Sequence, residues 1–204
     1  MLHSLHLVRH GEVHNPDGVV YADLPGFVLS DLGREQARAA AARIGSLGAD
    51  LVVTSPIARA RETAAPIAAA IGTTPMVDER LREWDLSRRW AGVRWVDLPG
   101  RFPGEVEAYL ADPANLPFSP ESIDEVGRRM SAVVDGLGRS HPGKVVVLVS
   151  HQDPVQALRL SLRGISWSSL SVDKPGHACV ITLVADGLAW DEVAAWEPAA
   201  DSPT

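Results

Sequence analysis

Two histidines and two arginines of this chain lie at the ends of predicted strands or at the start of a predicted helix, where they can form a pocket for an anion. Arg9 and His10 end one apolar run, and His151 ends another. Each run is typical of a buried strand, and ligand crevices of open α/β sheets lie beyond the carboxyl ends of strands. Arg59 falls in the first turn of a predicted helix after a further strand, where a cation opposes the helix dipole unless an anion binds there.

The chemistry that suits this set is phosphoryl transfer to a histidine. Parallel neighbouring strands bring both imidazoles to one sheet edge, and guanidinium groups match phosphate oxygens. A zinc site with Glu12, His14 or Asp153 as further ligands is the first competitor, but two arginines oppose a divalent cation and HExxH spacing is absent. A serine hydrolase is the second, but the sequence has no G-x-S-x-G elbow. Histidine then remains as the nucleophile.

The elements that must position these residues alternate along the chain. Strands are predicted over 5–8, 50–54, 74–77 and 144–149, and a terminal hairpin over 178–184 and 188–196. Helices are predicted over 31–47 with Ser30 as N-cap, from Ser55-Pro56 with Ser55 as N-cap and a kink or break at Pro66, from Ser119-Pro120, and from Asp153-Pro154 with Asp153 as N-cap. This order predicts one three-layer α/β/α domain, 1–204, with a mainly parallel central sheet and an antiparallel edge strand.

Two segments stand outside this alternation. Residues 13–29 form a loop rich in Pro, Gly, Asp and Asn that leaves the predicted site, and long loops of this kind are usually functional. Residues 80–120 hold five prolines and three tryptophans, Trp84, Trp90 and Trp95. We interpret them as a small cap insertion over one end of the sheet, too short for a second domain. Its tryptophans fill the core of the cap or line a substrate pocket, and the first role is favoured.

The bulk composition restricts location and partners. A net charge of −7 argues against a nucleic-acid partner. No apolar run approaches the roughly 20 residues of a membrane span, and we find no signal peptide, so no membrane partner is expected. One cysteine, Cys179, rules out internal disulfides and is expected to be a buried structural thiol. These features predict a cytoplasmic protein; a homodimer is left open.

Four motifs, in order along the chain, resemble one known family. The chain resembles the histidine phosphatase superfamily, which includes cofactor-dependent phosphoglycerate mutases. The resemblance rests on Leu7-Val8-Arg9-His10-Gly11-Glu12 with Leu29-Ser30-x-x-Gly33-x-x-Gln36-Ala37, then Thr54-Ser55-Pro56-x-x-Arg59-Ala60-x-x-Thr63-Ala64, Leu81-x-Glu83, and Val149-Ser150-His151.

The resemblance implies a role for each matching residue. His10 would accept the phosphoryl group as phosphohistidine, and Arg9, Arg59 and His151 would bind its oxygens, without a metal or other cofactor. Glu83 would protonate the leaving oxygen and later accept a proton from water. Because transferring phosphoryl groups carry charge on their equatorial oxygens, fixed cations supply most of such catalysis.

Several positions near these motifs leave alternatives open. Asp85 and Glu79 are substitutes for Glu83 as the acid, and Glu12 is a candidate to hold an arginine or a backbone amide. The family often has asparagine six positions after the nucleophile. Here Asn15 stands five positions after it, following His14, and either is a candidate phosphate contact.

The residue after the last histidine is also a departure, since many relatives have glycine where this chain has Gln152. Gln152 is expected to bind the phosphate or narrow the pocket. The sequence after Glu83 matches the family poorly, which leaves the substrate undefined. The function predicted first is a phosphatase for a small phosphate monoester, with a phosphorylated protein side chain also open. The alternatives are a mutase-type phosphoryl transfer and a non-catalytic module that binds a phosphorylated ligand.

Overall fold

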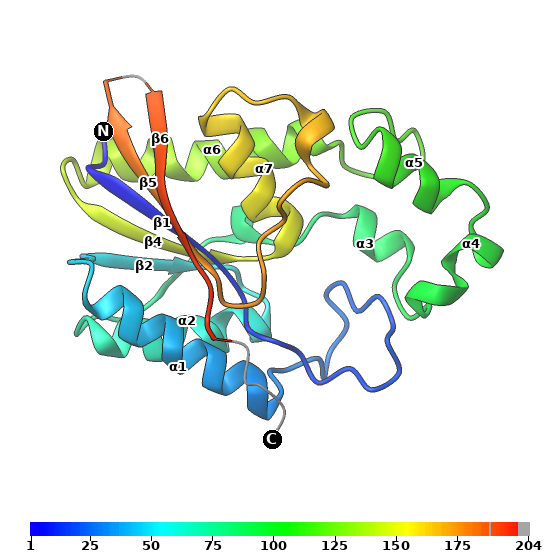
Figure 1. Ribbon diagram of the computed structural model, residues 1–204, viewed down its shortest axis with the longest axis horizontal. Helices are drawn as coiled ribbons and strands as arrows, with labels where there is room; N and C mark the ends of the chain where they lie inside the picture. Colours follow the sequence, from blue (N-terminus) through cyan, green and yellow to red (C-terminus); the bar gives the residue numbers. More distant parts are fainter. Residues whose placement is uncertain (188, 200–204) are drawn as a thin grey trace.

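A computed structural model describes residues 1–187 and 189–199 as a single six-stranded sheet between two helical layers (Figure 1). The strand order is β3-β2-β4-β1-β5-β6. The strands are β1 (Ser4–Arg9), β2 (Leu51–Thr54), β3 (Met76–Val77), β4 (Val145–Ser150), β5 (Val180–Asp186) and β6 (Ala189–Trp196). Strands β1 to β4 are parallel, and β5 runs antiparallel to both of its neighbours, so the reversed strand lies next to the edge.

The helices divide between the two faces of the sheet, which confirms the predicted α/β/α layers. Helices α1 (Asp31–Gly45) and α2 (Ala58–Ala70) cover one face, and α6 (Ile123–Ser140) and α7 (Gln152–Leu162) cover the other. Strand β4 explains this arrangement. Val147 and Val149 pack in the cluster with α1 and α2, whereas Val146 and Leu148 pack in the cluster with α6 and α7. Apolar residues at every position therefore bury a central strand on both faces.

Three helix starts differ from the local prediction, and a fourth agrees. Ser30 caps α1 as predicted, accepting the Gly33 N–H at 2.9 Å. Helix α6 begins after Ser122 rather than Ser119, because Ser122 and Glu125 form a capping box. The reciprocal hydrogen bonds of that box satisfy two free backbone donors at once, which one serine before a proline does not.

The helix after β2 begins later than predicted. Ile57 is the N-cap of α2, without a side-chain hydrogen bond, and the prediction of Ser55 as its cap is wrong. The Ser55 hydroxyl instead contacts a buried histidine. The helix also continues through Pro66 without a break.

The start of α7 is the third such difference. His151 is its N-cap and Gln152 its first residue, so the prediction of Asp153 as cap is wrong. The Asp153 carboxylate accepts a hydrogen bond from Lys174 Nζ at 2.7 Å instead. A charged partner outcompetes the local backbone for this side chain.

The cap lies beyond one end of the sheet, next to the loop 13–29 (Figure 1). It comprises η1 (Glu79–Leu81), α3 (Leu86–Arg89), η2 (Trp95–Asp97), α4 (Leu98–Arg101) and α5 (Glu105–Ala111). Backbone hydrogen bonds tie the loop to it, from Val20 N to Val93 O at 2.8 Å and from Trp95 N to Gly18 O at 3.0 Å. Trp84 and Trp90 are buried, so they do fill the core of the cap, whereas Trp95 is 45% exposed.

The C-terminal part of the chain agrees with the sequence prediction in its hairpin and in its cysteine. The terminal hairpin forms as β5 and β6, and Cys179 is buried, which raises the pKa of its thiol to about 11. No helix within residues 1–187 and 189–199 is long and apolar enough to cross a membrane. Another η helix, η3 (Trp167–Ser169), follows α7. The last eight residues of the chain are predicted from the sequence to be disordered, and of these 200–204 lie outside the described residues.

A close backbone approach fixes the turn after β1 against α1. A Cβ at Gly33 would lie 2.0 Å from the Glu12 carbonyl oxygen, and a Cβ at Gly11 would lie 2.5 Å from the Gly33 carbonyl oxygen. No side chain fits either position without moving backbone. Glycine is therefore required here for space rather than for a left-handed φ.

We predict that Gly33→Ala lowers the free energy of unfolding by about 3 kcal/mol, because its methyl group overpacks the contact with Glu12. Gly45→Ala in the same helix is the matched control, since its Cβ would meet only the Ala70 Cβ at 3.8 Å. That change is expected to stabilise by up to about 1 kcal/mol through helix propensity. Urea unfolding measures both, and equal effects would contradict the prediction.

Candidate active site

The candidate site is built where three parallel strands end side by side. Strand pairing places Arg9 opposite Ser150, and the His10 N–H donates to the Ser150 carbonyl at 3.0 Å. The Ser55 N–H donates to the Val149 carbonyl at 2.9 Å. The turns after β1, β2 and β4 thus share one edge, as the sequence predicted.

The His10 ring is held with one nitrogen free to act as a nucleophile. Its Nδ1 lies 2.7 Å from the Gly11 carbonyl oxygen, which only accepts, so Nδ1 carries the proton. Nε2 therefore presents a lone pair, which accepts the Arg59 Nε–H at 3.1 Å. Burial first, and then Arg59 and Arg9, hold the His10 pKa well below its usual value. The imidazole is neutral at physiological pH, as a nucleophile requires.

The second histidine is oriented by a serine. His151 Nε2 lies 2.8 Å from Ser55 Oγ, and that hydroxyl oxygen also accepts the Ile57 N–H at 3.3 Å. The Ser55 proton is then available for Nε2, which leaves the His151 Nδ1–H as a donor. Burial, followed by Arg59, holds the His151 pKa well below its usual value. The two imidazole rings meet edge to face, with centroids 5.3 Å apart.

Several buried nitrogens of this site have no hydrogen-bond partner among the described residues. They are both Nη atoms of Arg59, Nε of Arg9 and Nδ1 of His151. Unpaired buried donors cost free energy, and natural interiors rarely keep them without a reason. Donors that lack acceptors and flank a nucleophile form a receptor for a small anion.

A carboxylate faces these donors. Glu83 Oε2 lies 4.0 Å from Arg59 Nη2 and 3.9 Å from His151 Nδ1, beyond hydrogen-bond distance. Burial first, and then Asp153, raise the pKa of Glu83 to about 7, although Arg59 and Arg9 oppose this shift. A carboxyl group that titrates near neutrality both donates and accepts protons, as an acid-base catalyst must.

The substitutes considered for Glu83 lie elsewhere. Glu79 is 70% exposed and pairs with Arg82, and Asp85 pairs with Arg88 at 3.0 Å. The Glu12 carboxylate holds neither an arginine nor a backbone amide among the described residues: it accepts the Ser30 hydroxyl at 2.6 Å. This bond fixes the turn after β1 to the start of α1.

Arg9 is anchored by a residue that the sequence reading missed. Its Nη1 donates to the Pro175 carbonyl at 2.9 Å, and its Nη2 contacts His177 Nε2 at 2.7 Å. Burial, then Arg9, lower the pKa of His177 to about 4, so the ring is neutral and accepts from Arg9. His177 stands in the turn before β5, and nothing in its local sequence indicates this contact.

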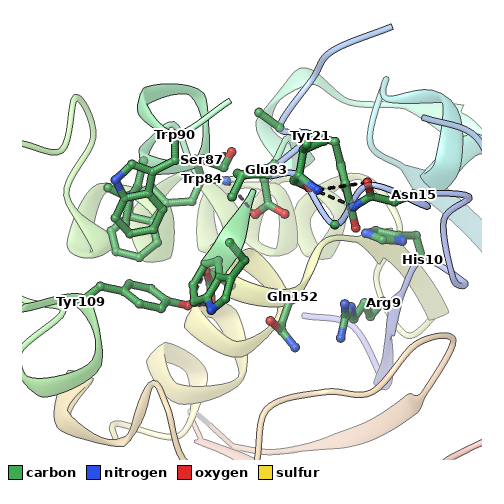
Figure 2. A pocket seen from close by; sticks show the side chains of 17 residues that line it. Arg9, His10, Asn15, Tyr21, Glu83, Trp84, Ser87, Trp90, Tyr109 and Gln152 are labelled. Carbon is green, nitrogen blue, oxygen red and sulfur yellow. Dashed lines mark hydrogen bonds between the residues drawn. The ribbon is translucent and has the colours of Figure 1, made fainter. Parts of the chain in front are cut away.

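A cavity of about 310 Å³ opens above these groups. Figure 2 shows Arg9, His10 and Glu83 pointing toward it. The following residues line it: Arg9, His10, Asn15, Gly18, Val19, Val20, Tyr21, Ala22, Glu83, Trp84, Leu86, Ser87, Trp90, Trp95, Tyr109, Gln152 and Asp153. The cap tryptophans therefore serve both roles considered for them.

The three residues predicted as candidate phosphate contacts differ in position. Asn15 lines the cavity, but its amide is bonded on both sides to the Val19 backbone, at 2.9 and 3.1 Å, and so shapes the loop. His14 is exposed and is not part of the cavity lining. Gln152 lines the cavity and reaches only the Pro175 carbonyl, at 3.4 Å. Within residues 1–187 and 189–199, no group of three His, Cys, Asp or Glu is arranged as a metal site.

Comparison with known proteins agrees with this geometry. A sequence model of the histidine phosphatase superfamily (branch 1) matches residues 5–196. Glucosyl-3-phosphoglycerate phosphatase of Mycobacterium tuberculosis is 32% identical over 175 residues, which cover 80% of this chain and 78% of that protein. Phosphoserine phosphatase 1 of Hydrogenobacter thermophilus is 30% identical over 167 residues, covering 81% and 78%.

The same relationship holds in three dimensions. A solved structure of the mycobacterial glucosyl-3-phosphoglycerate phosphatase superposes with a TM-score of 0.84 at 28% identity, over 97% of this chain and 99% of that one. The match extends over the cap as well as the sheet, so the insertion is part of the shared architecture.

We predict that Arg59→Met strongly weakens phosphate binding while stabilising the empty protein. Losing two charge-assisted hydrogen bonds is expected to weaken binding about 100-fold. Replacing an unpaired buried cation by a thioether is expected to raise the melting temperature by about 2–4 °C without phosphate.

Melting curves with and without inorganic phosphate measure both effects. Arg61→Met, at an exposed position of the same helix, is the control and is expected to keep the phosphate-dependent shift. If Arg59→Met keeps that shift too, Arg59 is not an anion ligand.

Proposed function

The chain belongs to the histidine phosphatase superfamily, and from this premise we propose that it is a phosphatase hydrolysing a small phosphate monoester through a phosphohistidine on His10. The observation that carries the proposal is the unprotonated Nε2 of His10, surrounded by the unpaired donors of Arg59, Arg9 and His151. Phosphate oxygens supply the acceptors that these donors lack.

The first step transfers the phosphoryl group to the protein. The Nε2 lone pair of His10 attacks phosphorus in line with the ester oxygen, and the P–O bond to the alcohol breaks. The Arg59 Nε–H, which occupies that lone pair in the empty site, moves to a phosphoryl oxygen. Glu83 gives its proton to the leaving oxygen, which is feasible because its pKa of about 7 keeps a large protonated fraction at neutral pH.

The second step regenerates the histidine. Glu83, now a carboxylate, takes a proton from water as the water oxygen attacks phosphorus, and the P–N bond returns its electron pair to His10. Arg59, Arg9 and the His151 Nδ1–H stabilise the charge on the equatorial oxygens in both steps. Dividing the hydrolysis into two displacements lowers the barrier of each.

Further proposals concern the size of the substrate, the residues around it, the location of the protein and its oligomeric state. The cavity of about 310 Å³ supports a small phosphorylated substrate. Gln152 is proposed to contact that substrate from the cavity wall, and Asn15 to shape the loop beneath it. A cytoplasmic location is consistent with the single buried thiol, and a homodimer stays a proposal that sedimentation would test.

His10→Ala is expected to lower kcat at least about 10³-fold on any monoester that the wild type hydrolyses, because the nucleophile is gone. Rapid quench after mixing with ³²P-labelled substrate should trap an acid-labile, base-stable phosphoprotein in the wild type alone. His14→Ala, an exposed neighbour, is the control and should retain both activity and labelling. A labelled His10→Ala protein would refute the assignment.

Glu83 should set the alkaline limb of the pH profile. Its proton is needed for the leaving group, so kcat/KM should fall as pH rises through about 7. Glu83→Gln should lose roughly 10²–10⁴-fold in kcat and lose this limb. Glu79→Gln, at an exposed position, should keep the wild-type profile. An unchanged limb in Glu83→Gln would assign the titration to another group.

A further inference from the structure

We infer that the cavity selects monoesters whose leaving alcohol is uncharged and carries a flat apolar group of about the size of a benzyl ring. This inference rests on the proposed function and names its substrate class. It comes from the walls of the cavity rather than from the phosphate-binding end.

Aromatic rings form the wall that faces a leaving group. Trp90, Trp95 and Tyr109 contact one another edge to face, with centroids 5.7 to 6.4 Å apart, and Trp84 lies 6.0 Å from Tyr109. All four line the cavity, and Figure 2 shows Trp84, Trp90 and Tyr109 together on one side of Glu83. Trp84, Trp90 and Tyr109 are buried and back this wall, whereas Trp95 is 45% exposed and presents aromatic surface for a further ring.

The polar atoms of this wall are already engaged. Trp84 Nε1 donates to the Glu121 carbonyl at 2.7 Å, and Trp90 Nε1 donates to Glu105 Oε2 at 2.9 Å. Both N–H groups are thus bonded within the protein, so these two indoles offer no hydrogen-bond donor to a ligand. Val19, Val20, Ala22 and Leu86 extend the apolar lining. Such a surface favours burial of an apolar group over binding of a polyol.

The charges of the cavity disfavour a second anionic group. Arg9 is the one cation among the described residues that line it, and it belongs to the phosphate end. Glu83 and Asp153 are the carboxyl groups of the lining. A carboxylate on the alcohol would meet Glu83 and find no unpaired cation, beyond Arg9, among the described residues that line the cavity.

A cationic group on the leaving alcohol also finds no free partner at Asp153 or Tyr109, because Lys174 already contacts both. Lys174 Nζ lies 2.7 Å from Asp153 Oδ1, and the Tyr109 hydroxyl donates to both Asp153 oxygens, at 3.2 and 3.1 Å. Lys174 also contacts the Tyr109 hydroxyl and lies 4.6 Å from the centre of its ring. The Asp153 carboxylate is therefore already paired with Lys174, and the cation-binding face of Tyr109 is occupied. The wall is left suited to an uncharged aromatic group.

The volume agrees with a group of this size. About 310 Å³ equals the space of roughly ten water molecules. A phosphate and one phenyl ring fill such a space, whereas a long peptide substrate does not fit inside it.

Four monoesters of primary alcohols test the inference, because their intrinsic reactivities are close: benzyl phosphate, ethyl phosphate, O-phosphoserine and choline phosphate. We expect kcat/KM for benzyl phosphate to exceed that for ethyl phosphate at least about tenfold, from burial of the ring. O-Phosphoserine and choline phosphate are expected to fall at or below ethyl phosphate.

Trp95→Ala provides the matched variant, since Trp95 is 45% exposed and its removal disturbs the buried core less than removal of Trp84 or Trp90 would. It should lower kcat/KM for benzyl phosphate about tenfold and leave ethyl phosphate unchanged. Val96→Ala is the control, because Val96 is 74% exposed on the same turn and does not line the cavity. It should change neither value.

The outcomes separate the two proposals. Hydrolysis of all four esters with a preference for O-phosphoserine or choline phosphate overturns this inference and leaves the phosphatase intact. An equal loss on benzyl and ethyl phosphate in Trp95→Ala also overturns it. Failure of the wild type to hydrolyse any of the four refutes the proposed function and, with it, this inference.

Discussion

A buried positive charge without acceptors is the constraint on which the rest of the structure depends. Arg59 is fully buried, and both of its Nη atoms lack partners among the described residues. Burial lowers its pKa, although a guanidinium still stays charged. The empty protein thus carries an electrostatic cost that a bound phosphate removes. Keeping such a group in place requires a scaffold that does not relax around it.

That scaffold works through contacts that do not touch the substrate. The Thr63 hydroxyl accepts the Gly11 N–H at 3.0 Å and donates to the Arg59 carbonyl at 2.8 Å, which joins the turn after β1 to the first turns of α2. Tyr21 lies with its ring 4.7 Å from the Arg59 guanidinium, so an aromatic face compensates part of the missing hydration. His177 orients Arg9 by accepting a hydrogen bond from its Nη2. Each of these contacts orients a charge and leaves its inner donors free.

The sequence predicted those parts of the site that depend on strand direction. His10 and His151 were expected at one edge because both follow apolar runs that had to be neighbouring parallel strands, and the register confirms it. Capping was predicted less well. Ser55 and Asp153 satisfy local rules for helix starts, yet tertiary partners claim both side chains. His177 was missed altogether, because its contact with Arg9 joins residues 168 positions apart and no local pattern records it.

Catalysis and selectivity are therefore supported by different physical means. The reacting groups sit on turns whose positions follow from backbone pairing, which many side-chain changes leave intact. The walls of the cavity belong to the loop 13–29 and the cap, held together by side-chain pairs such as Asp23 with Arg82 and Arg88, both at 2.8 Å. Such exposed pairs contribute little stability each, so these walls can change without disturbing the sheet. The loop and the cap, on which the inferred preference for the leaving alcohol rests, are thus less constrained by the sheet than the turns are. The third motif accordingly ends at Glu83, directly before Trp84 of the aromatic wall, and the fourth resumes only at Val149, in strand β4.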